Sequence, residues 1–180
     1  MSGRKDLSAR YRAGVSNNRG HDFEDAIKQA CAVYALQGRA KVEKTPEPFR
    51  VLEKREGGLF MGRFTAHAQP DFQGTLAGGR SVIFEAKYTS TEAMKRDVLT
   101  ETQMRTLEEH HRLGALAGVC VGIRDRFFFV PWPVWDGMKR YFGRQTVTEE
   151  DLEPFRVRFN RAVLFLDYVH ESQSRKGKKA

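Results

Sequence analysis

The chain has 180 residues, 40% of them hydrophobic, and a formal net charge of +8 at pH 7. This length suits a single domain with one sizeable core and is too short for two. No stretch approaches the roughly 18 consecutive apolar residues that a membrane helix needs, so we expect no membrane partner. The two cysteines, Cys31 and Cys120, lack the paired spacing of a zinc site or a disulfide framework, and we expect both to be reduced and buried.

The positive charge is concentrated at the two ends of the chain. Residues 1–19 hold five basic residues against one acidic residue, and residues 172–180 hold four against none. The whole chain has 31 basic and 23 acidic residues, and without these two segments 22 basic and 22 acidic residues remain. We expect a basic flexible N-terminal arm over residues 1–17, a folded domain over residues 18–171, and a basic flexible tail over residues 172–180. Such ends gain affinity for nucleic acid by releasing its counterions, although a solubility tail has the same composition.

In chain order, the first expected element is a helix over residues 22–37. Apolar residues such as Phe23, Ile27 and Tyr34 recur there at helical spacing, and a glycine follows. Residues 39–44 then alternate between polar and apolar side chains, which is typical of a strand.

A pair of prolines within residues 45–48 ends that strand. Apolar and basic residues then lie on both sides of Gly57 and Gly58, and this predicts a β-hairpin within an excursion over about residues 47–69.

Residues 71–75 and 81–87 are expected to form a second hairpin, joined by a glycine-rich turn. A helix is expected from Thr100 to Gly114, because Thr100 and Gln103 have the capping-box spacing. The remaining elements are expected at residues 119–123, 127–130 and 162–169 (strands), at residues 131–142 (helix) and from residue 148 (helix). This order predicts an α/β fold, in which a mixed β-sheet is flanked by helices.

The most specific chemical pattern is Asp71, thirteen intervening residues, and then Glu85-Ala86-Lys87. Side chains alternate along a strand, so Glu85 and Lys87 share a face, and the hairpin brings Asp71 beside them. Two carboxylates suit a hard cation such as Mg²⁺, and the lysine can orient or help deprotonate water for phosphodiester hydrolysis. The alternative is an ordinary pair of charges on a solvated strand. The apolar run at residues 82–84 favours a covered strand, where a charged side chain is unfavourable unless it has a partner or a function.

Two further side chains are candidates for the same site. Glu24 borders the apolar stripe of the first expected helix, where a carboxylate needs a cation partner, although the helix dipole alone would also favour an acid there. Gln103 lies at the start of its helix, where it is either a site residue or simply part of the cap.

Several motifs in succession resemble the RecU family of Holliday junction resolvases. They are Asn18-Arg19-Gly20-His21-Asp22-Phe23-Glu24, Asp71-Phe72-Gln73-Gly74, Phe84-Glu85-Ala86-Lys87, Gln103 eleven residues before Gly114, and Thr146-Val147-Thr148-Glu149-Glu150. The resemblance covers most of residues 17–170.

The resemblance implies a restriction-endonuclease-like nuclease of the PD-(D/E)XK superfamily, acting as a homodimer in DNA recombination and repair. Its catalytic set would be Asp71, Glu85, Lys87, Glu24 and Gln103. Asp71, Glu85 and Glu24 would bind Mg²⁺, for which Mn²⁺ could substitute, and no organic cofactor is expected. The partner would be a four-way DNA junction, in the cytoplasm of a bacterium and possibly encoded by a phage.

The excursion at residues 47–69 corresponds to the stalk that the family inserts into the junction centre. The residues expected to contact DNA are Arg19, Arg50, Lys54, Arg55 and Arg63. The excursion could also be an ordinary surface hairpin, because its charges nearly cancel. Two other functions fit parts of the pattern: a restriction-like nuclease that cuts duplex DNA, and a non-catalytic DNA-binding protein that relies on its basic ends.

Overall fold

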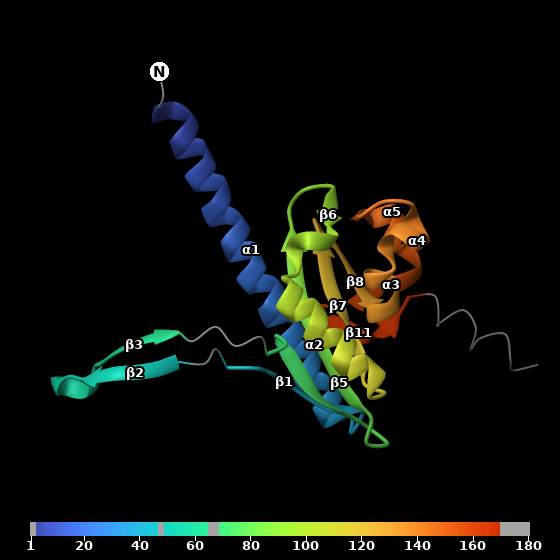
Figure 1. The fold of residues 1–180 in the computed structure, drawn as a ribbon, viewed down its shortest axis with the longest axis horizontal. Coiled ribbons are helices and arrows are strands. Elements are labelled where there is room, and N and C mark those ends of the chain that lie inside the picture. The colour runs from blue at the N-terminus through green and yellow to red at the C-terminus, as the bar shows by residue number, and fades with distance from the viewer. Residues whose placement is uncertain (1–2, 47–48, 65–68, 170–180) are drawn as a thin grey trace, which may run out of the picture.

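The computed structural model describes residues 3–46, 49–64 and 69–169, with side chains from residue 19 onward except those of Phe49 and Phe64. A five-stranded sheet lies at its centre, in the order β1-β4-β5-β7-β8 (Figure 1). The strands are β1 (Ala40–Lys44), β4 (Phe72–Leu76), β5 (Ser81–Thr89), β7 (Leu116–Ile123) and β8 (Arg126–Pro131). Within this sheet β5 and β7 are parallel and the other pairs are antiparallel, so the sheet is mixed.

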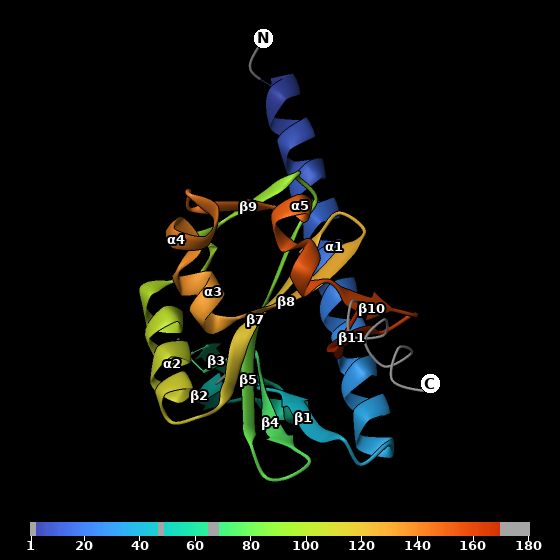
Figure 2. The same ribbon diagram turned by 90° about the vertical axis from the view of Figure 1, so that its right-hand side faces the viewer.

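Helices cover both faces of the sheet (Figure 2). One face packs against α1 (Gly3–Leu36) and against the pair of β10 (Val157–Phe159) and β11 (Val163–Tyr168). The other face packs against α2 (Glu101–Arg112) and α3 (Trp132–Asp136). Each face has its own apolar core, and the expected class, a mixed sheet flanked by helices, is confirmed.

The two cores follow from the alternation of side chains along the strands. On β5, Phe84 joins the α1 core and Ile83 joins the α2 core, and both are fully buried. Cys31 and Cys120 are buried free thiols in the α1 core, as expected. In the part of the chain that is described, no helix is long and apolar enough to cross a membrane.

The first helix is much longer than the sequence predicted. It begins at Gly3 and not near Asp22, so the backbone of residues 3–17, expected to be a flexible arm, is helical. The expected start relied on the apolar period, which begins only at Phe23. Lysine, arginine, alanine and leucine are good helix formers, however, and no proline interrupts this stretch. The N-terminal half of α1 projects beyond the sheet (Figure 1).

A two-stranded hairpin, β2 (Phe49–Lys54) and β3 (Phe60–Phe64), projects from the body on the same side as α1 leans (Figure 1). The short turn between its strands contains Gly57 and Gly58, whose φ angles of 74° and 78° favour glycine. This is the expected first hairpin. The ends of the expected excursion, at residues 47–48 and 65–68, lie outside the described residues, as do residues 170–180 with the expected tail.

Several smaller elements differ from expectation. The helix expected over residues 131–142 is two short helices, α3 and α4 (Met138–Phe142), which meet at Gly137. A Cβ on Gly137 would lie 2.9 Å from the carbonyl oxygen of Pro133, so the chain turns closely there. The short strands β6 (Ala93–Lys95) and β9 (Thr146–Thr148), which pair with each other, and β10 were not expected. The helix α5 (Glu149–Leu152) begins where a helix was expected.

Candidate active site

The candidate site forms where β4 ends and β5 continues. β4 pairs with β5 only as far as the Phe72–Phe84 pair, so the edge of β5 beyond Phe84 has no β4 partner. Asp71, which directly precedes β4, fills this place with its side chain. Its Oδ2 accepts a hydrogen bond from the backbone N–H of Ala86 at 2.9 Å. The end of one strand therefore fixes a carboxylate against the free edge of the next.

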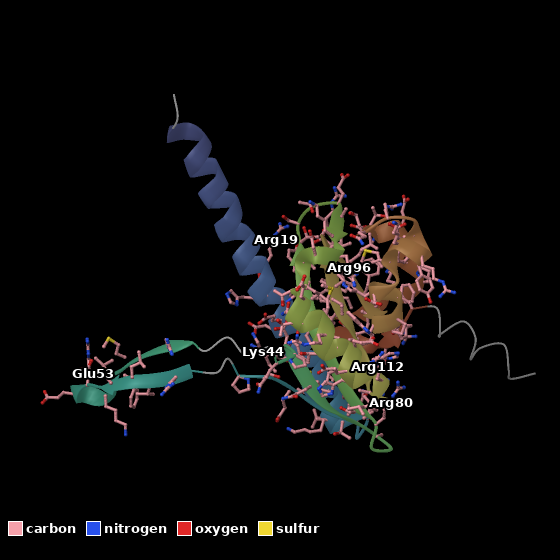
Figure 3. The ribbon with its side chains drawn as sticks, viewed as in Figure 1. Arg19, Lys44, Glu53, Arg80, Arg96 and Arg112 are labelled. Carbon is pink, nitrogen blue, oxygen red and sulfur yellow. The ribbon has the colours of Figure 1, made fainter. Side chains whose placement is uncertain are left out.

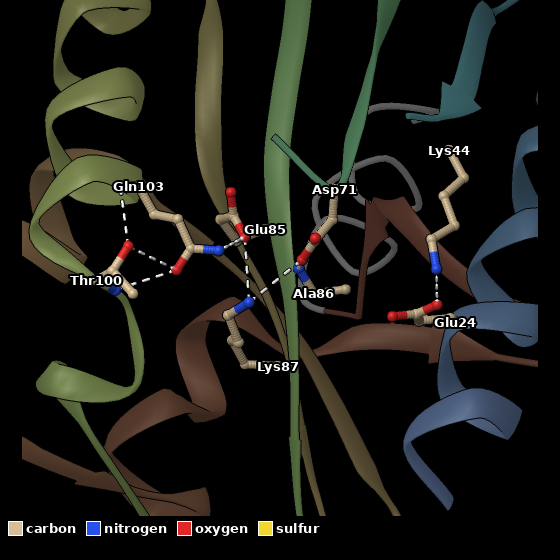
Figure 4. A network of polar contacts seen from close by, with 8 residues as sticks. All are labelled: Glu24, Lys44, Asp71, Glu85, Ala86, Lys87, Thr100 and Gln103. Atoms are coloured by element: carbon tan, nitrogen blue, oxygen red, sulfur yellow. Dashed lines mark hydrogen bonds and ion pairs between the residues drawn. The ribbon is translucent and has the colours of Figure 1, made fainter. Parts of the chain in front are cut away.

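Glu85 and Lys87 lie beside Asp71 (Figure 4). The ammonium of Lys87 lies 3.1 Å from Oε2 of Glu85 and 3.3 Å from Oδ2 of Asp71, and so bridges the two carboxylates. Glu85 is only 1% exposed and is the one charged residue among the described side chains that is fully buried. The expectation that Asp71, Glu85 and Lys87 converge is met by this geometry.

Gln103 combines the two roles that the sequence left open. Its Oε1 accepts a hydrogen bond from the backbone N–H of Thr100 at 3.0 Å, and its own backbone N–H donates to the Thr100 hydroxyl at 3.2 Å, which completes the capping box of α2. Its amide Nε2 donates to Oε2 of Glu85 at 2.6 Å. The cap thus turns the NH₂ group of the amide toward the buried carboxylate (Figure 4).

The surroundings of Glu85 and Lys87 shift the pKa of both groups. Burial, together with the neighbouring Asp71 carboxylate, raises the pKa of Glu85 to about 8, against the opposing effect of Lys87. Burial also lowers the pKa of the Lys87 ammonium, but Asp71 and Glu85 together outweigh this and raise that pKa above its usual value. A second positive charge would relieve the repulsion between the carboxylates.

Glu24 lies apart from this group. Its carboxylate forms an ion pair with the ammonium of Lys44, at the end of β1, and among the described side chains no hydrogen bond or ion pair joins it to Asp71, Glu85 or Lys87. Among the described residues, no group of three or more acidic, histidine or cysteine side chains is arranged to hold a metal. A metal-binding role for Glu24 therefore stays a prediction.

Lys44 is the partner of Glu24, and the sequence analysis did not predict this pair. Ala40 and Val42 are buried against α1, and side chains two residues apart share a strand face, so Lys44 was bound to approach α1. The spacing of Ala40, Val42 and Lys44 therefore predicts that Lys44 faces α1. It does not predict that Glu24 is the partner of Lys44.

The residues expected to contact DNA lie on the two projections. Arg50, Lys54, Arg55 and Arg63 are exposed on the hairpin, and Arg19 is exposed on α1, near the place where the helix leaves the body (Figure 3). Arg50 and Arg63 are directly opposite each other across the hairpin. Like charges in that position are unfavourable unless an anion lies between or beside them.

Apolar side chains on the same hairpin are also exposed. They are Val51, Leu52, Leu59, Phe60 and Met61. Such a patch on a small projection is typical of an interaction surface.

Comparison with known proteins identifies a family. The model of one family, RecU (Recombination protein U), matches residues 18–173, which include the whole candidate site. No curated protein matches. Among solved structures, Hjc of Archaeoglobus fulgidus, a Holliday junction resolvase from an archaeal hyperthermophile, is similar, with 13% sequence identity and a TM-score of 0.45 over 78% of this chain and 95% of that chain. Because the family match spans most of the sequence, the chain belongs to the RecU family of Holliday junction resolvases.

Proposed function

We propose that this chain is a Mg²⁺-dependent endonuclease that cuts four-way DNA junctions as a homodimer. One observation carries the proposal: Asp71, Glu85 and Lys87 meet at the free edge of β5, with Gln103 bound to the buried carboxylate. This is a compact group of two acids and a base, built by two adjacent strands and one helix.

The donor set fits a divalent cation. Asp71 and Glu85 are two hard oxygen donors, and burial together with the Asp71 charge raises the pKa of Glu85, so a cation beside them would be stabilised. When bound, Mg²⁺ would supply Lewis-acid stabilisation of the negative charge that develops on the phosphate. Mn²⁺ has the same preference for oxygen donors and would be expected to substitute. Glu24 would enter this set only if its pair with Lys44 opened.

The protein side chains have separate tasks in this scheme. Lys87 has a raised pKa in the cation-free site and so is an ammonium at neutral pH, which suits it to hold a phosphate oxygen or a water molecule by hydrogen bonds. Gln103 holds the Glu85 carboxylate in one orientation through a donor that is itself fixed by the α2 cap.

The projections suit a branched substrate. The hairpin and the N-terminal half of α1 extend from the body and carry the exposed arginines described above (Figures 1 and 3). One chain supplies one such catalytic group in its described part, whereas resolving a junction requires two opposed strands to be cut. Two copies of the chain would supply the second site.

The direct test is cleavage of a labelled synthetic four-way junction with and without Mg²⁺, resolved on a denaturing gel. We expect paired symmetric nicks that require the cation. Asp71→Asn and Glu85→Gln should each abolish cleavage, since each removes an oxygen donor for the cation. Junction binding should stay intact in both, or become stronger in Asp71→Asn, which also removes a negative charge that repels phosphate. Residual cleavage above about a tenth of the wild-type rate, a loss of only ~1.4 kcal/mol in transition-state stabilisation, would refute the assignment.

A matched control is Glu43→Gln. Glu43 is an exposed acid on β1 that pairs with Lys41, so its loss changes the net charge equally without touching the site. It should cleave as the wild type does.

A further inference from the structure

Thr45, which directly follows β1, lies opposite Asp71. The register of β1 and β4 ends with the Lys44–Phe72 pair, and the next opposed residues are Thr45 and Asp71. The backbone N–H of Thr45 donates to the carbonyl oxygen of Asp71 at 2.9 Å, so the antiparallel pairing continues through this position.

Directly opposed residues of an antiparallel pair point to the same face of a sheet. Phe72 is buried in the core beneath α1, and Lys44 pairs with Glu24 of α1. The residues that follow and precede them, Thr45 and Asp71, therefore point toward the other face, which is also the face of Glu85 and Lys87. The Thr45 side chain is therefore expected on the same face of the sheet as the Asp71 side chain, at the directly opposed position of the neighbouring strand.

The hydroxyl of Thr45 has no explanation in the fold. Its oxygen is inaccessible to solvent and has no hydrogen-bond partner among the described residues. It caps no described helix. A buried hydroxyl without a partner is unfavourable and calls for a role outside the resting structure. The hydrogen bonds that Asp71 accepts from the backbone of Ala86 and from the ammonium of Lys87 go to Oδ2.

We infer that Thr45 is a positioning residue of the active site, whose hydroxyl donates to the carboxylate of Asp71 when a divalent cation is bound there. The inference rests on the proposed function, because it assigns to Asp71 a role in holding the cation. A carboxylate that binds a metal is usually held by a second hydrogen bond of this kind, and its loss weakens metal binding by roughly 10- to 100-fold. Thr45 supplies that bond from the neighbouring strand.

The test is Thr45→Val, which removes the hydroxyl and keeps the shape of the side chain. Binding of Mn²⁺ to the DNA-free protein is measured by electron paramagnetic resonance, beside junction cleavage and thermal unfolding. We expect Mn²⁺ affinity and cleavage to fall about tenfold or more. The melting temperature of the cation-free protein should be unchanged or higher, since an unpaired buried hydroxyl is lost. A structural role would give the opposite, a lower melting temperature with unchanged Mn²⁺ affinity, and would overturn the inference.

Two further variants complete the test. Thr45→Ser keeps the hydroxyl and should restore Mn²⁺ affinity. Thr75→Val removes a hydroxyl from an exposed threonine of β4 on the same face and should have no effect. If the wild-type protein binds no Mn²⁺, the cation-dependent function fails and the inference fails with it. If the wild type and Thr45→Val bind Mn²⁺ equally, only the inference fails.

Discussion

The side chain of Gln103 meets two demands with its two polar atoms. The carbonyl oxygen completes the α2 cap with Thr100, and the NH₂ group binds Glu85. Since the cap uses the oxygen, the amide cannot turn without breaking it. Residues that fix a helix end thus also fix the orientation of a buried acid.

Gln103→Glu separates these two roles. Glutamate is a favoured residue at this capping position, so α2 should keep its stability. The variant would, however, place an acceptor against Glu85 where the wild type has a donor. We expect cleavage to fall roughly 10- to 100-fold with an unfolding free energy close to that of the wild type. Full cleavage by Gln103→Glu would contradict the donor role and would favour direct binding of the cation by residue 103.

The buried acid Glu85 also predicts how stability depends on pH. Its pKa is raised from 4.5 to about 8 in the cation-free protein, so between these values the folded state holds a proton that the unfolded chain releases. The contribution of Glu85 to the free energy of unfolding should therefore be largest at or below pH 4.5. It should be lost as the pH rises toward 8.

Glu85→Gln removes this titration. Measured by urea unfolding in the presence of a chelator, the variant should gain stability relative to the wild type as the pH rises from 5 to 8.5. Parallel pH profiles for the two proteins would show that Glu85 is not protonated in the folded state.

At the residue scale, the sequence predicted the positions that follow from the alternation of side chains along a strand. Asp71, Glu85 and Lys87 were placed together correctly, because a hairpin of known register brings them to one edge. The partner of Glu24 could not be predicted, since it depends on how α1 packs against the end of β1. Neither the spacing of residues nor the composition determines the angle at which α1 packs against β1.

At the scale of elements, prediction succeeded where a pattern was long. The apolar run of β5 and the capping box of α2 each determine an element by several agreeing residues. The strands β6 and β9 have three residues each, too few to show a period, and they form only because they pair with each other. The start of α1 was missed because the apolar period used to predict the helix begins only at Phe23.

Position 74 of β4 accepts only glycine, because β1 passes close to it. A Cβ at this position would lie 2.0 Å from the carbonyl oxygen of Lys41 and 2.6 Å from Cα of Val42, which are backbone atoms of β1. No side-chain rotation can relieve such contacts. Gly74→Ala should therefore push β1 away from β4 and destabilise the protein by about 1–3 kcal/mol, and cleavage should fall because Asp71 is anchored by the same strand.

Chemical denaturation measures this effect. The matched control is Thr75→Ala, an exposed neighbour whose replacement should change the unfolding free energy by no more than about 0.5 kcal/mol. If Gly74→Ala were as stable as this control, β1 and β4 would have to lie farther apart than in this structure.

At the scale of the whole molecule, the proposed function divides two tasks between the group of Asp71, Glu85 and Lys87 and the projections. A group of carboxylates on a sheet edge can engage any phosphodiester, since contacts to the DNA backbone do not distinguish one shape from another. Recognition of an open junction centre needs a part that reaches away from the sheet. The hairpin of β2 and β3 is such a part, with the opposed Arg50 and Arg63 and an exposed apolar patch.

Replacing residues 53–64 by a short Gly-Ser turn tests this division. The core and the catalytic group lie outside the replaced segment, so the shortened protein should fold and bind Mn²⁺ as the intact protein does. It should lose preference for junctions over duplex DNA and cleave junctions poorly, because the replacement removes most of the exposed basic and apolar side chains that we propose contact the junction centre. They are Lys54, Arg55, Leu59, Phe60, Met61 and Arg63. The measurement is the ratio of junction to duplex dissociation constants at one fixed salt concentration, since salt alone shifts both. An unchanged ratio would remove the hairpin from junction recognition, even if every catalytic assignment held, and would leave α1 as the projection to test.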